Sequence, residues 1–324
     1  MEEIKTLAFG YCVNIQRIFI PKSVKAINGT AFSGCASLKE FIVDDENPYF
    51  TSDNGVIYTK DMVELVKCPM ALYAASYQIP DGVVKISDYA FNKCKDIEKF
   101  YLPESIEEIG SSAFEECTMS AIRVPQATSS LKMMAFENCD QLENFVIPEK
   151  VEELPLMLLA YCDNLSYVYI PTGVKKFGLS VFSSCKALSV INCRISNIDA
   201  TEFAESYGGG YEQFKNIPDT CTWRIPIGCK ERYQAQPWWV STWRIIEAND
   251  PTPDGIDHIS TSESLRIEVR NGRISLSSDR DMAIRIYEVD GVLKRTVALR
   301  HGETVHVDLP RGIYIIGGKK IVLK

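Results

Sequence analysis

One short motif returns about every 23 residues through most of this 324-residue chain. Each copy reads Ile-Pro, then two spaced apolar residues, then Ala-Phe, Cys and Leu, at nearly constant spacing. Counting from Cys117, the next three copies of the cysteine follow at steps of 22, 23 and 23 residues. A fixed short period is typical of a solenoid, in which each repeat forms one coil and stacks on its neighbours. The motif therefore predicts a solenoid with about 23 residues in each coil.

The residues around the proline carry the strand pattern of each coil. In one copy Leu142, Phe145 and Ile147 precede Pro148, and the last three positions alternate inward and outward as in a half-buried strand. Proline has no backbone donor and ends the ladder on that side. The Val-Lys-x-Ile segment after it predicts a second short strand, and Ala-Phe…Cys turns the chain and fills the core. The fold class expected is therefore mainly β, with two parallel sheets around a strip of Phe, Cys, Leu and Ile.

Cysteine use follows the repeat more closely than any redox or metal pattern. Zinc needs paired ligands at short spacing, such as Cys-x2-Cys, and the chain has none. A small, easily buried side chain in one core slot accounts for most of the eleven cysteines. Of the others, Cys221 and Cys229 flank a Trp-Arg-Ile-Pro segment, and a disulfide between them stays open as an alternative. The seven cysteines that share the slot are Cys12, Cys35, Cys94, Cys117, Cys139, Cys162 and Cys185.

The spacing of the repeats also predicts the domain organisation. The 59-residue interval from Cys35 to Cys94 holds extra residues, and Asn54-Gly55 before Val-Ile-Tyr indicates a β-hairpin insertion over residues 44–72. The regular pattern stops after Leu188, so residues 192–220, with three glycines at 208–210, are expected to form a loop or a short helix. All four tryptophans lie between 223 and 243 and predict a cap over residues 221–247. Residues 1–248 are then one solenoid.

The repeat pattern ends before residue 248, and a different sequence pattern follows. Residues 249–255 are polar and rich in proline, as in a domain linker. Residues 256–324 contain seven short alternating segments separated by turns such as 271–272, 290–291 and 311–312. This spacing predicts a small antiparallel β-sandwich.

Charge and hydropathy limit the kinds of partner that the chain can bind and its possible association with a membrane. The net charge of −8 and the pI of about 5.2 disfavour nucleic acid, which needs clustered Lys and Arg. No run of about 18 apolar residues exists, so we expect no transmembrane segment. The first residues are acidic and show no signal peptide. Because the chain opens partway through a repeat, we expect that the natural protein begins earlier or that this is a processed or cloned fragment.

Catalytic motifs are not evident in the sequence. The three histidines, His258, His301 and His306, all lie in the linker or tail, so no Ser-His or Cys-His arrangement can form within the solenoid. No phosphate-binding glycine loop is present. We therefore expect no enzyme activity, no cofactor and no metal.

A surface is the better candidate site. One outward position stands just before the last apolar residue of each first-sheet strand, and successive coils should stack these residues about 5 Å apart. Most of them are apolar or aromatic, which often marks a binding face; the alternative explanation is ordinary β-propensity. The outward pairs of the second sheet are mostly charged and should be solvated. The outer column comprises Phe19, Ile42, Gln78, Tyr101, Arg123, Val146, Tyr169 and Asn192, of which the candidate binding residues are Phe19, Ile42, Tyr101, Arg123, Val146 and Tyr169.

The repeat, with Pro, Ala-Phe and Cys recurring in register over residues 4–247, resembles the BspA-like leucine-rich repeats of bacterial surface proteins. The tail is similar to the C-terminal sorting or anchoring β-domains of secreted proteins, through its Ile286-Tyr287-x-x-Asp290-Gly291 and Leu309-Pro310-x-Gly312 segments. These resemblances imply an extracellular or outer-surface protein that binds other proteins or acts in adhesion. The second hypothesis is a carbohydrate-binding surface protein that stacks sugars on Phe19, Tyr101 and Tyr169.

Overall fold

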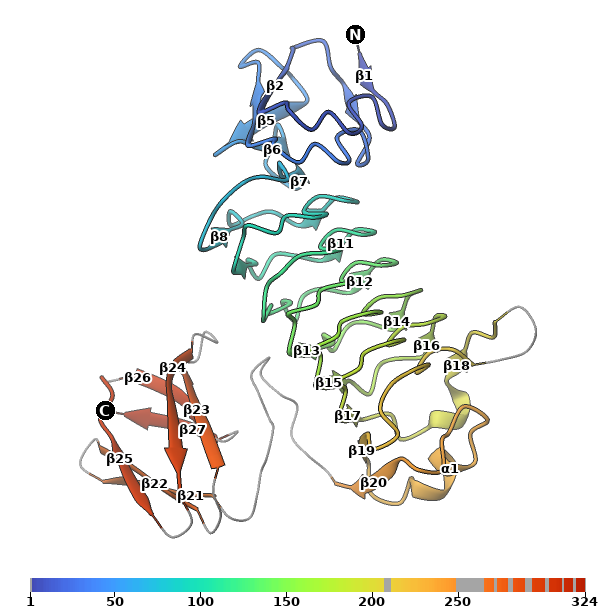
Figure 1. The fold of residues 1–324 in the computed structure, drawn as a ribbon, viewed down its shortest axis with the longest axis vertical. Helices are drawn as coiled ribbons and strands as arrows, with labels where there is room; N and C mark the ends of the chain where they lie inside the picture. The colour runs from blue at the N-terminus through green and yellow to red at the C-terminus, as the bar shows by residue number, and fades with distance from the viewer. Residues whose placement is uncertain are drawn as a thin grey trace. The chain divides into compact units, whose positions relative to one another are not determined.

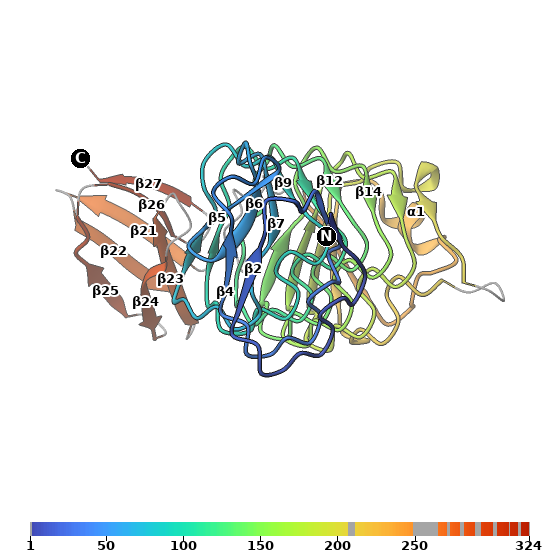
Figure 2. The same ribbon diagram turned by 90° about the horizontal axis from the view of Figure 1, so that it is seen from above.

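The computed structural model describes residues 2–206 and 211–248, and in the tail residues 265–270, 273–278, 282–288, 293–300, 303–310, 312–316 and 319–323. The chain divides into two compact units, Met1–Asp250 and Pro251–Lys324. The first unit is a solenoid of stacked coils, seen from the side in Figure 1 and from above in Figure 2. Among the described residues, none of the helices is both long and apolar enough to cross a membrane.

Most coils contribute one strand to each of two sheets, and the strands of neighbouring coils pair in parallel; the coil of Ile122 contributes only an isolated bridge to Phe100 in the first sheet. The alternation predicted from the sequence is present, since β2 is exposed and buried at successive residues. The proline that follows ends the strand, as expected for a residue without a backbone donor. The first sheet consists of three hydrogen-bonded segments: β2 (Arg17–Ile20) with β4 (Glu40–Val43); β8 (Tyr77–Gln78) with β10 (Phe100–Tyr101); and β13 (Asn144–Val146), β15 (Tyr167–Ile170), β17 (Val190–Cys193), β19 (Thr222–Ile225) and β20 (Arg244–Glu247). The second also has three segments: β1 (Glu3–Ile4) with β3 (Ala26–Ile27); β9 (Lys85–Ile86), β11 (Glu108–Ile109) and β12 (Ser130–Leu131); and β14 (Glu153–Leu154), β16 (Lys176–Phe177) and β18 (Glu202–Phe203).

The Ala-Phe loops add a third ladder of hydrogen bonds that is not a β-sheet. The backbone N–H groups of Tyr89, Phe91 and Lys93 donate to carbonyls of the next coil at 2.8, 2.7 and 2.8 Å. Tyr89 and Lys93 have φ of 60° and 63°, in the left-handed region that disfavours side chains with a Cβ. The same pair of left-handed positions, four residues apart, recurs in the loops at 7/11, 112/116, 134/138, 157/161 and 180/184, whereas the loop before the insertion has only Gly34 in this region. The inter-coil bonds therefore offset a backbone cost in each coil that has the pair.

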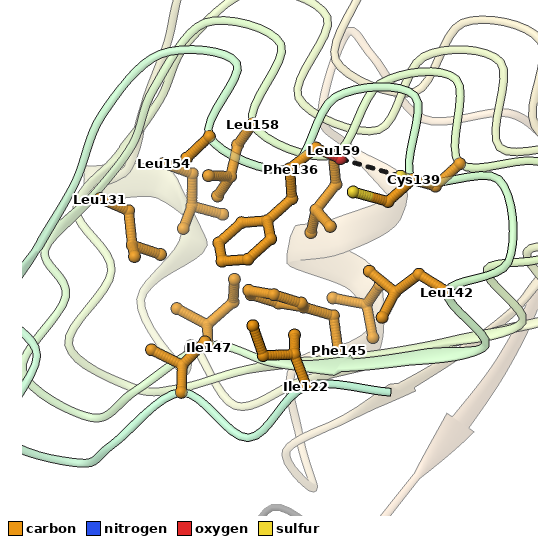
Figure 3. Packing of buried hydrophobic residues seen from close by; sticks show 14 of the residues in the cluster. Ile122, Leu131, Phe136, Cys139, Leu142, Phe145, Ile147, Leu154, Leu158 and Leu159 are labelled. Atoms are coloured by element: carbon orange, nitrogen blue, oxygen red, sulfur yellow. Dashed lines mark hydrogen bonds between the residues drawn. The ribbon is translucent and has the colours of Figure 1, made fainter. Parts of the chain in front are cut away.

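The core is a continuous strip of stacked rings and aliphatic side chains. Phe114 stacks on Phe91 at a centroid distance of 5.1 Å and on Phe136 at 5.3 Å, with interplanar angles of 14° and 2°. Figure 3 shows Phe136 and Phe145 packed among leucines and isoleucines of neighbouring coils. Because every coil supplies the same side chains, burial in one coil depends on the presence of the next.

The cysteines of the repeat form a ladder of their own. The thiol of Cys117 donates to the Phe91 carbonyl at 3.1 Å, and Cys139 donates to the Phe114 carbonyl at 3.2 Å. The seven repeat cysteines are buried except Cys12, in the first described coil, which is half-buried. All eleven cysteines lie in the described residues and are free thiols, including the two for which a disulfide was considered, Cys221 and Cys229.

The insertion forms a buried wall between two parts of the solenoid. Strands β5 (Phe50–Asp53) and β6 (Val56–Thr59) pair as an antiparallel hairpin through Asn54 and Gly55, whose φ angles are 48° and 80°. Strand β7 (Glu64–Lys67) is antiparallel to β6 and parallel to β9, so it joins the second sheet. Ile57 and Val66 face the N-terminal core, whereas the alternate residues face the main core. The hairpin insertion expected from the sequence is therefore an internal partition, β5–β7, in which β6 and β7 are buried on both faces and β5 is the partly exposed edge.

The stack continues beyond Leu188, which corrects the expectation of a loop over residues 192–220. Strand β18 pairs in parallel with β16, and Phe214 stacks on Phe182 at 5.7 Å. Only a short 3-10 turn, Ile198–Ala200, departs from the coil before β18. The glycines at 208–210 lie outside the described residues. The sequence hid this coil because Ile217 stands where earlier coils have cysteine, three residues after the phenylalanine.

Tryptophans close the C-terminal end of the core. Trp223, Trp238 and Trp243 are buried, and Trp223 lies 5.4 Å from Trp238 and 5.7 Å from Trp243 between ring centroids. The short helix α1 (Lys230–Gln234) places Tyr233 beside them, where its hydroxyl donates to the Ile195 carbonyl at 2.7 Å.

The second unit contains two antiparallel sheets. One has the order β21-β22-β25 and the other β24-β23-β26-β27. Ile274 of β22, Ile286 of β23 and Val297 of β24 belong to one buried apolar cluster, so both sheets contribute to it. The linker at 249–255 and the turns at 271–272 and 290–291 lie outside the described residues. The strands are β21 (Leu265–Arg270), β22 (Arg273–Ser278), β23 (Met282–Glu288), β24 (Leu293–Leu299), β25 (Thr304–Val307), β26 (Gly312–Ile316) and β27 (Lys319–Leu323).

Candidate functional site

The outer column lies on the outer side of the first sheet, and the strand register brings its members side by side. Phe19 pairs with Ile42, and Gln78 pairs with Tyr101. The partition interrupts the column after Ile42, because the N–H of Phe41 donates to the Gly55 carbonyl at 2.9 Å instead of meeting a strand of the next coil. The expected column is thus two separate segments.

The N-terminal segment is an exposed apolar pair. Phe19 is 59% exposed and Ile42 is 43% exposed, although they are direct neighbours on β2 and β4. In the adjacent row Arg17 forms an ion pair with Glu40. The outer side of these two strands therefore presents an apolar row beside a neutralised charged row.

The central segment mixes aromatic and polar groups. Tyr101 is 37% exposed and lies beside Gln78, which is also exposed. Arg123 follows in the next coil, half-buried, with its guanidinium bound to Glu104. Val146 is half-buried. This segment offers one ring face together with hydrogen-bonding groups.

The expectation that Tyr169 is a free surface residue is wrong. Tyr169 is only 2% exposed, and its hydroxyl donates to Glu149 of the preceding coil at 3.0 Å. Asn192, the next member of the column, is buried as well, and its amide donates to the Tyr167 hydroxyl at 3.2 Å. A tyrosine held by its hydroxyl lies along the sheet rather than projecting from it. The outer side of β15 is therefore covered over its whole length.

The second sheet is charged, as expected, and its charges are paired between coils. Lys85 lies 3.1 Å from Glu64 and 3.7 Å from Glu108. Lys176 lies 3.0 Å from Glu153. Such exposed pairs contribute little stability each, but they leave this face with neutralised charge and little apolar area.

Cys139 and Lys67 are ionisable groups buried in the interior of the solenoid. No cluster of three or more potential metal ligands occurs among the residues that the structure describes. Burial raises the pKa of the Cys139 thiol well above its usual range, which keeps it a weak nucleophile. Burial also lowers the pKa of Lys67, whose ammonium donates to the Tyr89 carbonyl inside the partition. The arrangement is suited to presenting a surface.

The stacked parallel coils define the chain as a leucine-rich-repeat solenoid. The BspA-type leucine-rich repeat model matches in six copies over residues 1–53 and 71–189. The chain belongs to this BspA-type leucine-rich repeat family. Proteins with repeats of this family are typically non-enzymatic binding proteins. The family match indicates no catalytic family for this chain. No curated protein matches the chain at a significant level.

Solved structures share the fold. The pneumococcal vaccine antigen PcpA aligns with a TM-score of 0.61 at 22% identity, over 73% of this chain and 57% of that chain. A leucine-rich repeat protein from Eubacterium ventriosum aligns with a TM-score of 0.50 at 23% identity, over 62% of this chain and 59% of that chain. At these identities the likeness shows the fold alone. The chain spans less than two thirds of the length of either structure.

Proposed function

We propose that the chain is a non-catalytic protein of the bacterial cell surface or extracellular space that binds another protein through the first sheet. The exposed pair Phe19 and Ile42 carries this proposal. Two large apolar side chains in register on the outer side of a sheet gain little from folding, because they stay in contact with water. Covered by a partner, each would contribute on the order of 1–2 kcal/mol.

Tyr101 supports the same function and also the alternative one. Aromatic residues at the centre of an interface commonly carry much of its binding energy. A ring face beside Gln78 and Arg123 also suits a sugar, which needs a flat apolar platform with hydrogen-bonding groups next to it. Carbohydrate binding at the central segment is therefore the second candidate function.

The tail fits the same setting. We infer that its two antiparallel sheets form a small β-sandwich, since one apolar cluster draws on both of them. A sorting or anchoring role for this unit rests on its sequence resemblance. Deleting it should then prevent surface display, and normal display without it would contradict that role.

Surface substitutions test the binding proposal. The double variant Phe19→Ser/Ile42→Ser and the single variant Tyr101→Ser are compared with wild type on an array of host extracellular proteins and on a glycan array. Loss of binding to an array protein in the double variant, with an unchanged melting temperature, supports the N-terminal segment as a protein-binding face. Losing an aromatic or apolar anchor commonly costs 2 kcal/mol or more, about thirtyfold in affinity.

Two further variants serve as controls. Ile227 is 64% exposed in the cap, outside the outer column, so Ile227→Ser should leave binding unchanged. Tyr169→Ser should lower the melting temperature, because the Tyr169 ring is buried. Glycan binding that depends on Tyr101 alone would favour the second function. Unchanged affinity in all column variants would contradict both.

A further inference from the structure

One slot of the Ala-Phe loop carries a carboxyl group in only two coils. This slot follows the aromatic or aliphatic core residue that recurs in each loop. It holds Gly10, Ser33, Asn92, Ala160 and Ser183 in the other regular coils, and Lys215 in the coil of Phe214. In the two central coils it holds Glu115 and Glu137. The N–H of Glu116 donates to the Glu137 carbonyl at 2.9 Å, so the two slots stack directly. Coils joined by such bonds lie about 5 Å apart.

Glu137 is buried without a compensating partner. Its side chain is only 7% exposed. Among the described residues, none forms a hydrogen bond or an ion pair with its carboxyl group. On the coil that follows, the same slot holds Ala160, whose side chain has no hydrogen-bond donor. The Ala160 carbonyl accepts the backbone N–H of Asn138.

The charged groups that face Glu137 come from the preceding coil and are acidic. Glu115 has its own donor, because the amide of Asn92 reaches its carboxylate at 3.0 Å. Glu116 lies 3.1 Å from Lys93 and 3.2 Å from Lys95. Glu115 and Glu116 thus each have a donor or a cation beside the carboxylate.

We propose that the Glu115–Glu137 pair holds one proton at neutral pH, chiefly on Glu137, so that the central coils bind a proton as they fold and loosen as the medium becomes alkaline. Two carboxylates stacked in a mostly buried slot repel each other, and protonating one of them removes the repulsion. Burial, then repulsion from Glu115 and Glu116, raises the pKa of Glu137 from 4.5 to about 7. The stabilisation from the bound proton is therefore complete below pH 4.5 and is lost as the pH rises through about 7.

A carboxyl titration of the full chain labelled with 13C-glutamate tests the proposal directly. One glutamate carboxyl should titrate with a midpoint near pH 7 and should disappear in Glu137→Gln. In Glu115→Gln the new amide stands beside Glu137 as Asn92 stands beside Glu115, and the midpoint should fall by about one unit or more. If every glutamate titrates below about pH 5.5 in the wild type, the proposal is wrong.

Stability measurements provide the second readout. The wild-type urea midpoint should fall between pH 5.5 and pH 8.5, and Glu137→Gln should remove part of that fall. The matched control is Glu107→Gln, an exposed carboxyl on the second sheet, which should keep the wild-type dependence. Equal dependence in wild type, Glu137→Gln and Glu107→Gln would overturn the proposal. If Glu137→Gln does not fold, the titration in Glu115→Gln decides, and a midpoint that stays near pH 7 there would exclude coupling within the pair.

Discussion

Replacing Cys139 by alanine tests whether the repeat cysteine acts through packing. The Cys139 side chain is fully buried and its thiol donates to the Phe114 carbonyl at 3.2 Å. Removing a group the size of one methylene costs about 1 kcal/mol in lost burial, and the void among rigid rings adds to this. The lost thiol hydrogen bond adds about 0.5 kcal/mol, the low end of the range, because the Phe114 carbonyl keeps the N–H of Cys117 at 3.1 Å. We expect a total near 2 kcal/mol.

Chemical denaturation followed by circular dichroism measures this loss across a series. Valine removes the donor and is larger than cysteine by about one methyl group, so the cost of Cys139→Val combines the lost hydrogen bond with overpacking of the filled slot. Serine keeps a donor and loses volume, so Cys139→Ser should cost about as much as alanine. Cys12→Ala is the matched control, and at a half-buried position it should cost less than half as much. A nearly neutral serine with a costly alanine would show that the hydrogen bond dominates, and rapid thiol labelling of Cys139 in the native protein would refute its burial.

Two more predictions concern the partition and the tail. Lys67→Met should stabilise the protein at neutral pH by about 1–2 kcal/mol, because the buried amine has one carbonyl partner and its pKa is lowered by burial. A lowered amine pKa makes wild-type stability rise with pH towards 10.5, so the variant should show a weaker rise, and an unchanged slope in urea denaturation would contradict this. A fragment that starts at Asp254 should fold alone and give dispersed amide NMR signals, whereas signals collapsed into the random-coil range would place the domain boundary elsewhere.

The periodic part of the fold was predictable because each coil repeats the same physical solution. Inward residues of the strands, the strand-ending proline and the buried cysteine recur at fixed steps, and each has a role that its chemistry explains. The third ladder was not predictable in the same way. Its left-handed positions hold residues as different as Tyr89, Lys93 and Met134. The inter-coil hydrogen bonds, and not the type of side chain, stabilise that backbone conformation.

The errors arose where tertiary contacts replaced the repeated residues. The coil around Phe214 lacks the cysteine of the motif, and only its stacking on Phe182 reveals it. Tyr169 occupies an outward position by register, but the hydroxyl bond to Glu149 turns it along the sheet. The alternation along a strand predicts on which side of the sheet the Cβ atom lies. It does not predict whether the far end of a long side chain is exposed or buried.

The partition changes how the candidate site must be understood. Strand β7 joins the insertion to the second sheet on its C-terminal side by pairing with β9, whereas β4 of the first sheet meets the hairpin turn at Gly55. The strands that carry Phe19 and Ile42 therefore line a different core and form a different sheet segment from the strand that carries Tyr101. Because the partition interrupts the outer column after Ile42, a ligand cannot contact all members of the column as one continuous surface. Two short faces of different chemistry, one apolar and one aromatic with polar neighbours, can bind independently, and substitutions in one should leave the affinity of the other unchanged.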